Sequence, residues 1–281
     1  MTPTLPADPQ SELENDDELV RFESEGAAPL PAAEVEGYLD SKGARIWYAA
    51  YGSGPTLVLL HGGLGNSGNW GYQVPVFVGR GYRVIVIDSR GHGRSTRTEE
   101  PYSYALMGDD VLAVMDVLEV ENAVLVGWSD GACTALILAH RHPERVRGVV
   151  YFACNMDPSG TKPFELTPRI ERCLSRHRKD YARLSPTPDD FDSFFEAVGQ
   201  MQRTQPNYTA KDLREIAVPV LILHAEHDEF IRREHAEYLH DNVANSAFEL
   251  LANVSHFAPV QRPMQFSASV LAFVERCELD T

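Results

Sequence analysis

The chain has 281 residues, a hydrophobic fraction of 43% and a formal net charge of -16 at pH 7. This charge argues against nucleic-acid binding and anionic membrane surfaces, because phosphate binding needs clustered Lys and Arg. No apolar run approaches the roughly 18 residues of a membrane helix, and the acidic N-terminus has no pattern of a secretory signal. We therefore expect a cytoplasmic protein whose four cysteines are reduced thiols.

Residues 1–33 are predicted to form a flexible acidic tail. The run Ser11–Leu19 is almost entirely polar and acidic, and prolines surround Pro29 and Pro31. Such a segment buries too little apolar surface to offset the entropy that it loses on ordering. An arm that docks on the body of the protein is the alternative.

From residue 34 onward, short apolar runs alternate with helical patterns. Continuous runs of this length are typical of strands that are buried on both faces of a parallel sheet. The runs are Thr56–Leu60, Arg83–Ile87, Ala123–Val126, Gly148–Phe152 and Val218–Leu223. Their alternation with helices predicts the α/β class, with a doubly wound, mostly parallel sheet.

Residues 158–213 interrupt this alternation, because they contain helical patterns and no strand pattern. The apolar face of one predicted helix is supplied by Phe191, Phe194, Phe195, Val198 and Met201. A helical insertion between parallel strands packs over the carboxyl edge of the sheet, where ligands bind in such folds. We predict a cap over residues 158–213, and a core of residues 34–157 and 214–281.

A Gly-x-Ser-x-Gly motif at Gly127–Gly131 marks the candidate nucleophile. The predicted strand Ala123–Val126 precedes it, and a helical pattern follows it. This order is that of a nucleophile elbow, in which glycines permit a strained turn that exposes the serine hydroxyl. The sequence therefore predicts Ser129 as a nucleophile, and a glycine-rich turn with an incidental serine is the alternative.

A serine hydroxyl attacks only when a base removes its proton, so an acid and a histidine should follow later in the chain. Asp228 comes after the run Val220–Leu223, and His256 ends the segment Phe248–His256, which contains the last predicted strand. The order Ser, Asp, His is the one found with nucleophile elbows. We predict a triad of Ser129, Asp228 and His256, with Glu226 or Glu229 as the alternative acid.

An oxyanion hole requires two backbone N–H groups that point at the developing negative charge. The glycine-rich loop His61–Gly65 follows a predicted buried strand and permits close backbone approach. We predict the N–H groups of Gly63 and Asp130 as the donors, with Gly62 or Leu64 as alternatives to Gly63. His61 is expected to order this loop.

Together with the turn Asp88–Ser95, these motifs resemble the α/β-hydrolase family. The turn is rich in polar groups but lacks the spacing of a phosphate-binding loop. The Gly-Trp-Ser-Asp-Gly form and the small cap are similar to the esterase, lactonase and valacyclovir-hydrolase-like branch. The resemblance implies an eight-stranded, mostly parallel sheet with a helical cap, no metal and no cofactor. It disfavours the epoxide and haloalkane hydrolase branches, which use an aspartate nucleophile.

The expected function is therefore that of a serine hydrolase that cleaves a small-molecule ester or lactone through an acyl-enzyme on Ser129. A hydrolase of carbon–carbon bonds, a cofactor-free lyase or oxidative enzyme, and a ligand receptor are the alternatives on the same fold. The sequence fixes neither the natural substrate nor the oligomeric state.

The side chain of Asp130 has two interpretations, because it puts a carboxylate beside the place where negative charge develops. In the first, the carboxylate turns aside and hydrogen-bonds a neighbouring loop or the helix N-terminus. In the second, it receives a positively charged group of the substrate, such as the α-amino group of an amino-acid ester.

Overall fold

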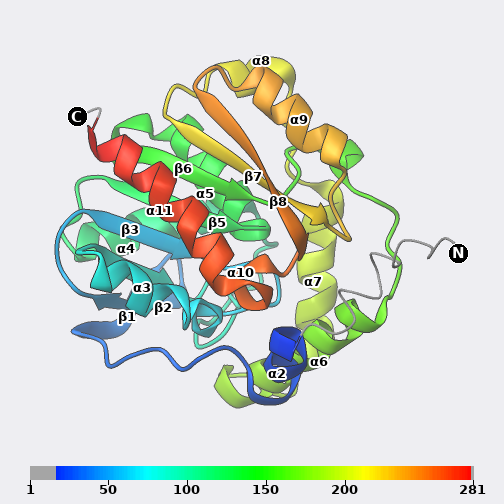
Figure 1. Ribbon diagram of the computed structural model, residues 1–281. Helices are drawn as coiled ribbons and strands as arrows, with labels where there is room; N and C mark the ends of the chain where they lie inside the picture. Colours follow the sequence, from blue (N-terminus) through cyan, green and yellow to red (C-terminus); the bar gives the residue numbers. More distant parts are fainter. Residues whose placement is uncertain (1–16, 280–281) are drawn as a thin grey trace, which may run out of the picture.

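The computed structural model describes residues 17–279, and an eight-stranded sheet lies at its centre (Figure 1). The strand order is β1-β2-β4-β3-β5-β6-β7-β8, in which β2 is antiparallel to both β1 and β4 and all other neighbours are parallel. The sheet confirms the predicted fold class. The strands are β1 (Val35–Ser41), β2 (Ala44–Tyr51), β3 (Thr56–Leu60), β4 (Arg83–Ile87), β5 (Ala123–Trp128), β6 (Val146–Phe152), β7 (Val220–His227) and β8 (Ser246–Ser255).

Helices cover both faces of the sheet, with α3 and α11 on one face and α4 and α5 on the other (Figure 1). The helices that flank the sheet are α3 (Gln73–Gly79), α4 (Tyr104–Val117), α5 (Asp130–Arg141), α9 (Arg233–Asn242), α10 (Ala258–Gln261) and α11 (Pro263–Leu279). Short 3-10 turns are η1 (Ser67–Trp70), η2 (Pro143–Arg145) and η3 (Pro158–Gly160).

The central strand β3 shows how the sheet builds a core on each face. Successive side chains of a strand point to opposite faces. Leu57 and Leu59 join the core that contains Phe266 of α11, whereas Val58 and Leu60 join the core under α4 and α5. A continuous apolar run is therefore required here, because both faces of the strand are buried.

Between β6 and β7 the chain forms helices, of which the first two lie beyond the carboxyl ends of the parallel strands, whereas the third lies beside α9 (Figure 1). The helices of this segment are α6 (Pro168–Leu184), α7 (Phe191–Thr204) and α8 (Ala210–Arg214). The Thr167 hydroxyl accepts the N–H of Ile170 and caps α6, with Pro168 in the first turn. A helical cap is therefore present. Its domain boundaries at 157/158 and 213/214 stay a prediction, and α8 crosses the second one.

The predicted flexible tail over residues 1–33 is wrong for its described part, and residues 1–16 lie outside the described residues. A helix, α2 (Asp17–Glu25), packs against α6 and α10. Leu19 and Phe22 are buried, and the rings of Phe22 and His177 form a T-shaped contact with centroids 6.1 Å apart. The spacing of i and i+3 puts these two apolar residues on one helix face, which anchors an otherwise acidic segment.

No helix within residues 17–279 combines the length and the apolar character that crossing a membrane requires. Cys133, Cys154 and Cys173 are buried thiols outside any disulfide.

Candidate active site

Ser129 stands at the sharp turn between β5 and α5, with φ of 53° and ψ of -122°. A side chain at positive φ is strained, at a cost of about 1–3 kcal/mol, and persists only where the surroundings enforce it. Here the Ser129 N–H donates to the Phe152 carbonyl at 2.8 Å, and the Ser129 carbonyl accepts the Ala132 N–H at 2.7 Å. Sheet and helix together therefore hold the serine in this conformation.

The two glycines of the motif are required because backbone segments approach them closely. A Cβ atom on Gly127 would overlap the backbone of Ala132, and one on Gly131 would overlap the carbonyl of Leu60. The turn thus has the geometry of a nucleophile elbow.

Asp228 and His256 lie at the ends of neighbouring strands, after β7 and β8. The Asp228 carboxylate accepts a hydrogen bond from the His256 ring. The His256 Nδ1 atom lies 3.1 Å from Oδ1 and 3.0 Å from Oδ2 of Asp228. Its Oδ1 also accepts the backbone N–H groups of Phe230 and Ile231, each at 2.8 Å. These bonds put the proton of a neutral imidazole on Nδ1 and leave Nε2 as the basic nitrogen.

Two other carboxylates near this strand end were alternatives for the acid. Glu226 accepts the backbone N–H of Asn253 at 2.8 Å, and Glu229 accepts the backbone N–H of His256 at 3.0 Å. Asp228 is the carboxylate that contacts the His256 ring.

Burial and pairing act in opposite directions on the two ionisable groups. Burial lowers the pKa of His256, but the charge and the hydrogen bond of Asp228 raise it more, so it lies above the ordinary 6.5. Burial raises the pKa of Asp228, but the charge and the hydrogen bond of His256 lower it more, so it lies below the ordinary 3.8. The pair therefore stabilises a protonated imidazole beside an ionised carboxylate.

Trp128, the residue before Ser129, brings the histidine loop to the elbow. Its indole N–H donates to the His256 carbonyl at 2.9 Å, and the two rings lie 6.4 Å apart. A direct bond from the Ser129 hydroxyl to His256 Nε2 stays a prediction of the triad.

The predicted oxyanion loop follows β3 and is held by its histidine. His61 Nδ1 donates to the Gly62 carbonyl at 2.8 Å, and Nε2 accepts the Ser89 N–H at 3.0 Å. A Cβ atom on Gly62 would lie 3.3 Å from Cβ of Ser129, so the loop lies against the nucleophile. The donor roles of Gly63 and Asp130 stay a prediction.

The Asp130 carboxylate is buried and hydrogen-bonded within the protein. It accepts the Tyr104 hydroxyl at 2.9 Å and Nε2 of Gln202, in the cap helix α7, at 3.0 Å. Burial raises the pKa of Asp130, against the hydrogen bonds from Gln202 and Tyr104, which lower it. Neither Tyr104 nor Gln202 could be predicted from the sequence, because neither belongs to a motif. The carboxylate is hydrogen-bonded as in the first interpretation, with other partners than those expected. Both donors are neutral groups, so binding of a substrate cation, as in the second interpretation, stays a prediction.

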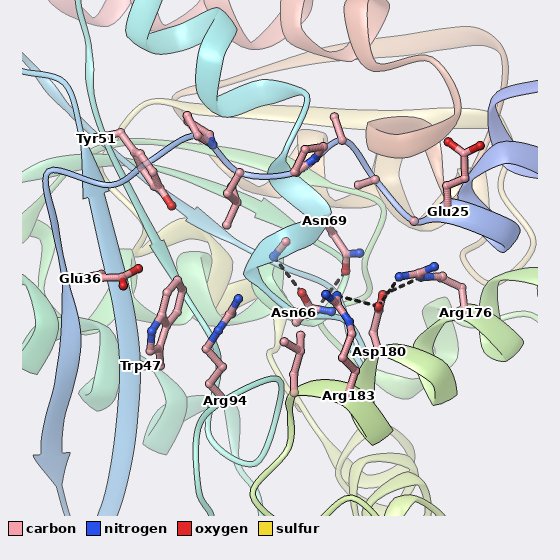
Figure 2. A pocket seen from close by; sticks show the side chains of 18 residues that line it. Glu25, Glu36, Trp47, Tyr51, Asn66, Asn69, Arg94, Arg176, Asp180 and Arg183 are labelled. Atoms are coloured by element: carbon pink, nitrogen blue, oxygen red, sulfur yellow. Dashed lines mark hydrogen bonds and ion pairs between the residues drawn. The ribbon is translucent and has the colours of Figure 1, made fainter.

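A cavity of about 400 Å³ lies between the segment after α2, strand β2 and the cap helix α6 (Figure 2). Arg176 and Arg183 both point at Asp180, and Arg94 lies over the ring of Trp47 at 4.1 Å (Figure 2). The predicted catalytic residues are not among those that line this cavity.

The comparisons with known proteins agree with this fold. A family model described as alpha/beta hydrolase fold matches residues 55–169. Epoxide hydrolase B of Mycobacterium tuberculosis is 39% identical over 124 residues, which cover 42% of this chain but only 35% of that protein's length. The 3-oxoadipate enol-lactonase 2 of Acinetobacter baylyi is 24% identical over 267 residues, covering 88% of this chain and 99% of the relative.

Two further relatives match along most of their length. Serine hydrolase BPHL of Homo sapiens is 26% identical, covering 82% of this chain and 83% of the relative. The solved structure of Est816, described as an N-acyl homoserine lactone degrading enzyme, is 26% identical with a TM-score of 0.68 and covers 84% of this chain and 100% of its own. The family model, these relatives and the eight-stranded sheet agree, and the chain has the alpha/beta hydrolase fold.

Proposed function

We propose that the protein is a serine hydrolase that cleaves a small-molecule ester or lactone through an acyl-enzyme on Ser129. The observations that carry the proposal are the Asp228–His256 hydrogen bond and a serine that is held at positive φ, whose neighbour Trp128 donates a hydrogen bond to the His256 carbonyl. This arrangement supplies a nucleophile, a base and a group that orients the base.

The proposed reaction has two steps. In the first, His256 takes the Ser129 proton as the hydroxyl oxygen bonds to the acyl carbon, and the N–H groups of Gly63 and Asp130 stabilise the oxyanion. His256 then gives that proton to the departing alcohol oxygen. In the second, His256 takes a proton from water as the water oxygen bonds to the acyl carbon. His256 then gives this proton to the Ser129 oxygen as its bond to the acyl group breaks and the acid is released.

The choice of an ester-type bond is supported by the names of two relatives. One is an enol-lactonase and the other a lactone degrading enzyme, and lactones are cyclic esters. The epoxide hydrolase matches over a smaller part of this chain. A serine at the elbow favours an acyl-enzyme here, because the epoxide hydrolase branch uses an aspartate nucleophile.

Turnover of a panel of short p-nitrophenyl esters, lactones and amides tests this proposal, with Ser129→Ala as the control. We expect wild type to hydrolyse esters or lactones, and Ser129→Ala to lose at least about 10³-fold in rate with an unchanged circular dichroism spectrum. Substantial ester hydrolysis by a clean preparation of the variant would refute the assignment of the nucleophile.

A further inference from the structure

Glu229, the residue after the proposed acid, joins the histidine loop to the cap. Its Oε2 accepts the backbone N–H of His256 at 3.0 Å, and its Oε1 accepts Nη1 of Arg169 at 2.8 Å. The side chains are 9% and 13% exposed, so both charges are largely removed from water. A buried carboxylate of this kind depends on its cation, because an unpaired one is strongly destabilised.

His256 is consequently held at two places. Asp228 binds the ring at Nδ1, and Glu229 binds the main chain of the same residue. The first contact sets the tautomer and the tilt of the ring, and the second sets the position from which the ring extends. Position matters, since a displacement of about 1 Å can lower a rate by on the order of 100-fold.

The cap also contacts the loop that carries Asp228 and Glu229 through backbone hydrogen bonds. The segment before α6 forms an isolated antiparallel bridge between Thr161 and Ile231. The Lys162 N–H donates to the Phe230 carbonyl at 2.7 Å, and the Arg232 N–H donates to the Gly160 carbonyl at 2.9 Å. The ion pair of Arg169 and Glu229 therefore continues a line of contacts between the cap and the loop that carries the proposed acid.

We propose that Glu229 is a positioning residue for His256. Because Arg169 of the cap helix α6 binds Glu229, this positioning depends on the contact between the cap and the loop that carries Glu229. The inference rests on the proposed function, in which His256 is the base. It predicts that the cap does more than cover the site, because a cap residue holds the carboxylate that holds the histidine. The charges that raise the pKa of His256 are those of Asp228, Glu229 and Asp130, and His224 is a further titratable group that interacts with the His256 charge.

Two substitutions of Glu229 separate its hydrogen bond from its charge. Glu229→Gln keeps an oxygen that can accept the His256 N–H, whereas Glu229→Ala removes both the acceptor and the charge. We expect kcat to fall about 100-fold in Glu229→Ala and about tenfold in Glu229→Gln, with KM changed less than threefold in both. Glu234→Ala is the matched control, since Glu234 is exposed on α9 five positions along the chain, and it should keep the wild-type kcat.

The pH profile supplies a readout that a purely structural contact would not move. Loss of the Glu229 charge should shift the acid limb of kcat/KM to lower pH in Glu229→Gln, because a nearby negative charge favours the imidazolium. Arg169→Met should lower kcat by a similar factor to Glu229→Gln, and Arg169→Lys should restore part of it.

The outcomes distinguish this inference from the proposed function. If wild type shows no Ser129-dependent hydrolysis, the proposed function fails and the inference fails with it. If wild type is active but both Glu229 variants keep more than half of its kcat and its acid limb, only the inference is overturned. Melting temperatures identify a variant that does not fold, and if Glu229→Ala is lost in this way, Glu229→Gln and its pH profile decide.

Discussion

At the scale of the single residue, the conformation of Ser129 has a measurable cost. Its φ of 53° is enforced by the bonds to Phe152 and Ala132, so glycine at this position should be less strained than alanine. We expect Ser129→Gly to be more stable to urea than Ser129→Ala, by about 1–3 kcal/mol in the free energy of unfolding. Equal stability of the two inactive variants would mean that the turn is not strained.

The raised pKa of His256 predicts the pH dependence of activity. Only neutral imidazole accepts the serine proton, so kcat/KM should fall as pH drops through this pKa. Because Asp228 raises the pKa above 6.5, the midpoint of the acid limb should lie above pH 6.5 in wild type. Asp228→Asn should move the midpoint to lower pH and lower the rate. A wild-type midpoint below 6.5, or no shift in the variant, would show that this pair does not control the base.

The buried carboxylate of Asp130 predicts a preference among esters. Its side-chain donors, Tyr104 and Gln202, are neutral groups, so a protonated amine on the substrate would offset the cost of burying the charge. We expect an amino ester to exceed its methyl analogue by about tenfold to a hundredfold in kcat/KM, equivalent to roughly 1.5–3 kcal/mol. Asp130→Asn should abolish the difference. No preference in wild type, or a preference that survives in Asp130→Asn, would leave Asp130 with its internal hydrogen bonds alone.

The proposed catalytic residues that could be predicted from the sequence are those with a recognisable pattern in the neighbouring residues. Ser129 lies between glycines that the turn requires, and Asp228 and His256 each follow a strand. Gln202 and Arg169 could not be found in this way. Each acts across a distance of sixty or more positions, and only the packing of the cap brings them to Asp130 and Glu229.

At the scale of the element, α2 connects the N-terminal segment to the cap. Phe22 is fully buried against α6, so its removal should leave a cavity that the surroundings fill only in part. We expect Phe22→Ala to lower the free energy of unfolding by about 3–5 kcal/mol. Urea denaturation measures this change. Val20→Ala is the control, since Val20 lies exposed on the same helix, and an equal effect of the two changes would argue against docking of α2.

The elements that the sequence predicted were those with a continuous pattern. Each buried strand of the parallel part was visible as an apolar run, because both of its faces lie in a core. The edge strand β1 and the helix α2 were not predicted. β1 is largely exposed and lacks such a run, and the acidic composition of α2 concealed the two apolar side chains that anchor it.

At the scale of the whole molecule, buried histidines link stability to pH. Burial lowers the pKa of His92 to about 3 and that of His177 to about 4, below the ordinary 6.5. Between pH 6.5 and these values the unfolded chain binds protons that the folded chain does not, so stability falls as pH falls. The pKa of His256 is raised in the folded chain, so its contribution to stability increases as pH falls.

The histidine prediction is tested by urea unfolding at pH 7, 6 and 5. As pH falls, each of His92 and His177 should contribute a decrease in the free energy of unfolding of up to about 1.4 kcal/mol per pH unit in the lower part of this range. His177→Phe should remove one such contribution and give a shallower dependence. A variant whose stability falls as steeply as that of wild type would exclude His177 as a source of the acid sensitivity.

The central claim is that Ser129 is a nucleophile that His256 activates, and covalent labelling tests it most directly. Wild type is treated with an alkyl fluorophosphonate, and the intact mass and the peptide map are measured. We expect one adduct, on the peptide that contains Ser129, with labelling much slower in His256→Gln and absent in Ser129→Ala. Wild type that acquires no adduct, or Ser129→Ala that is labelled as fast as wild type, would contradict the account.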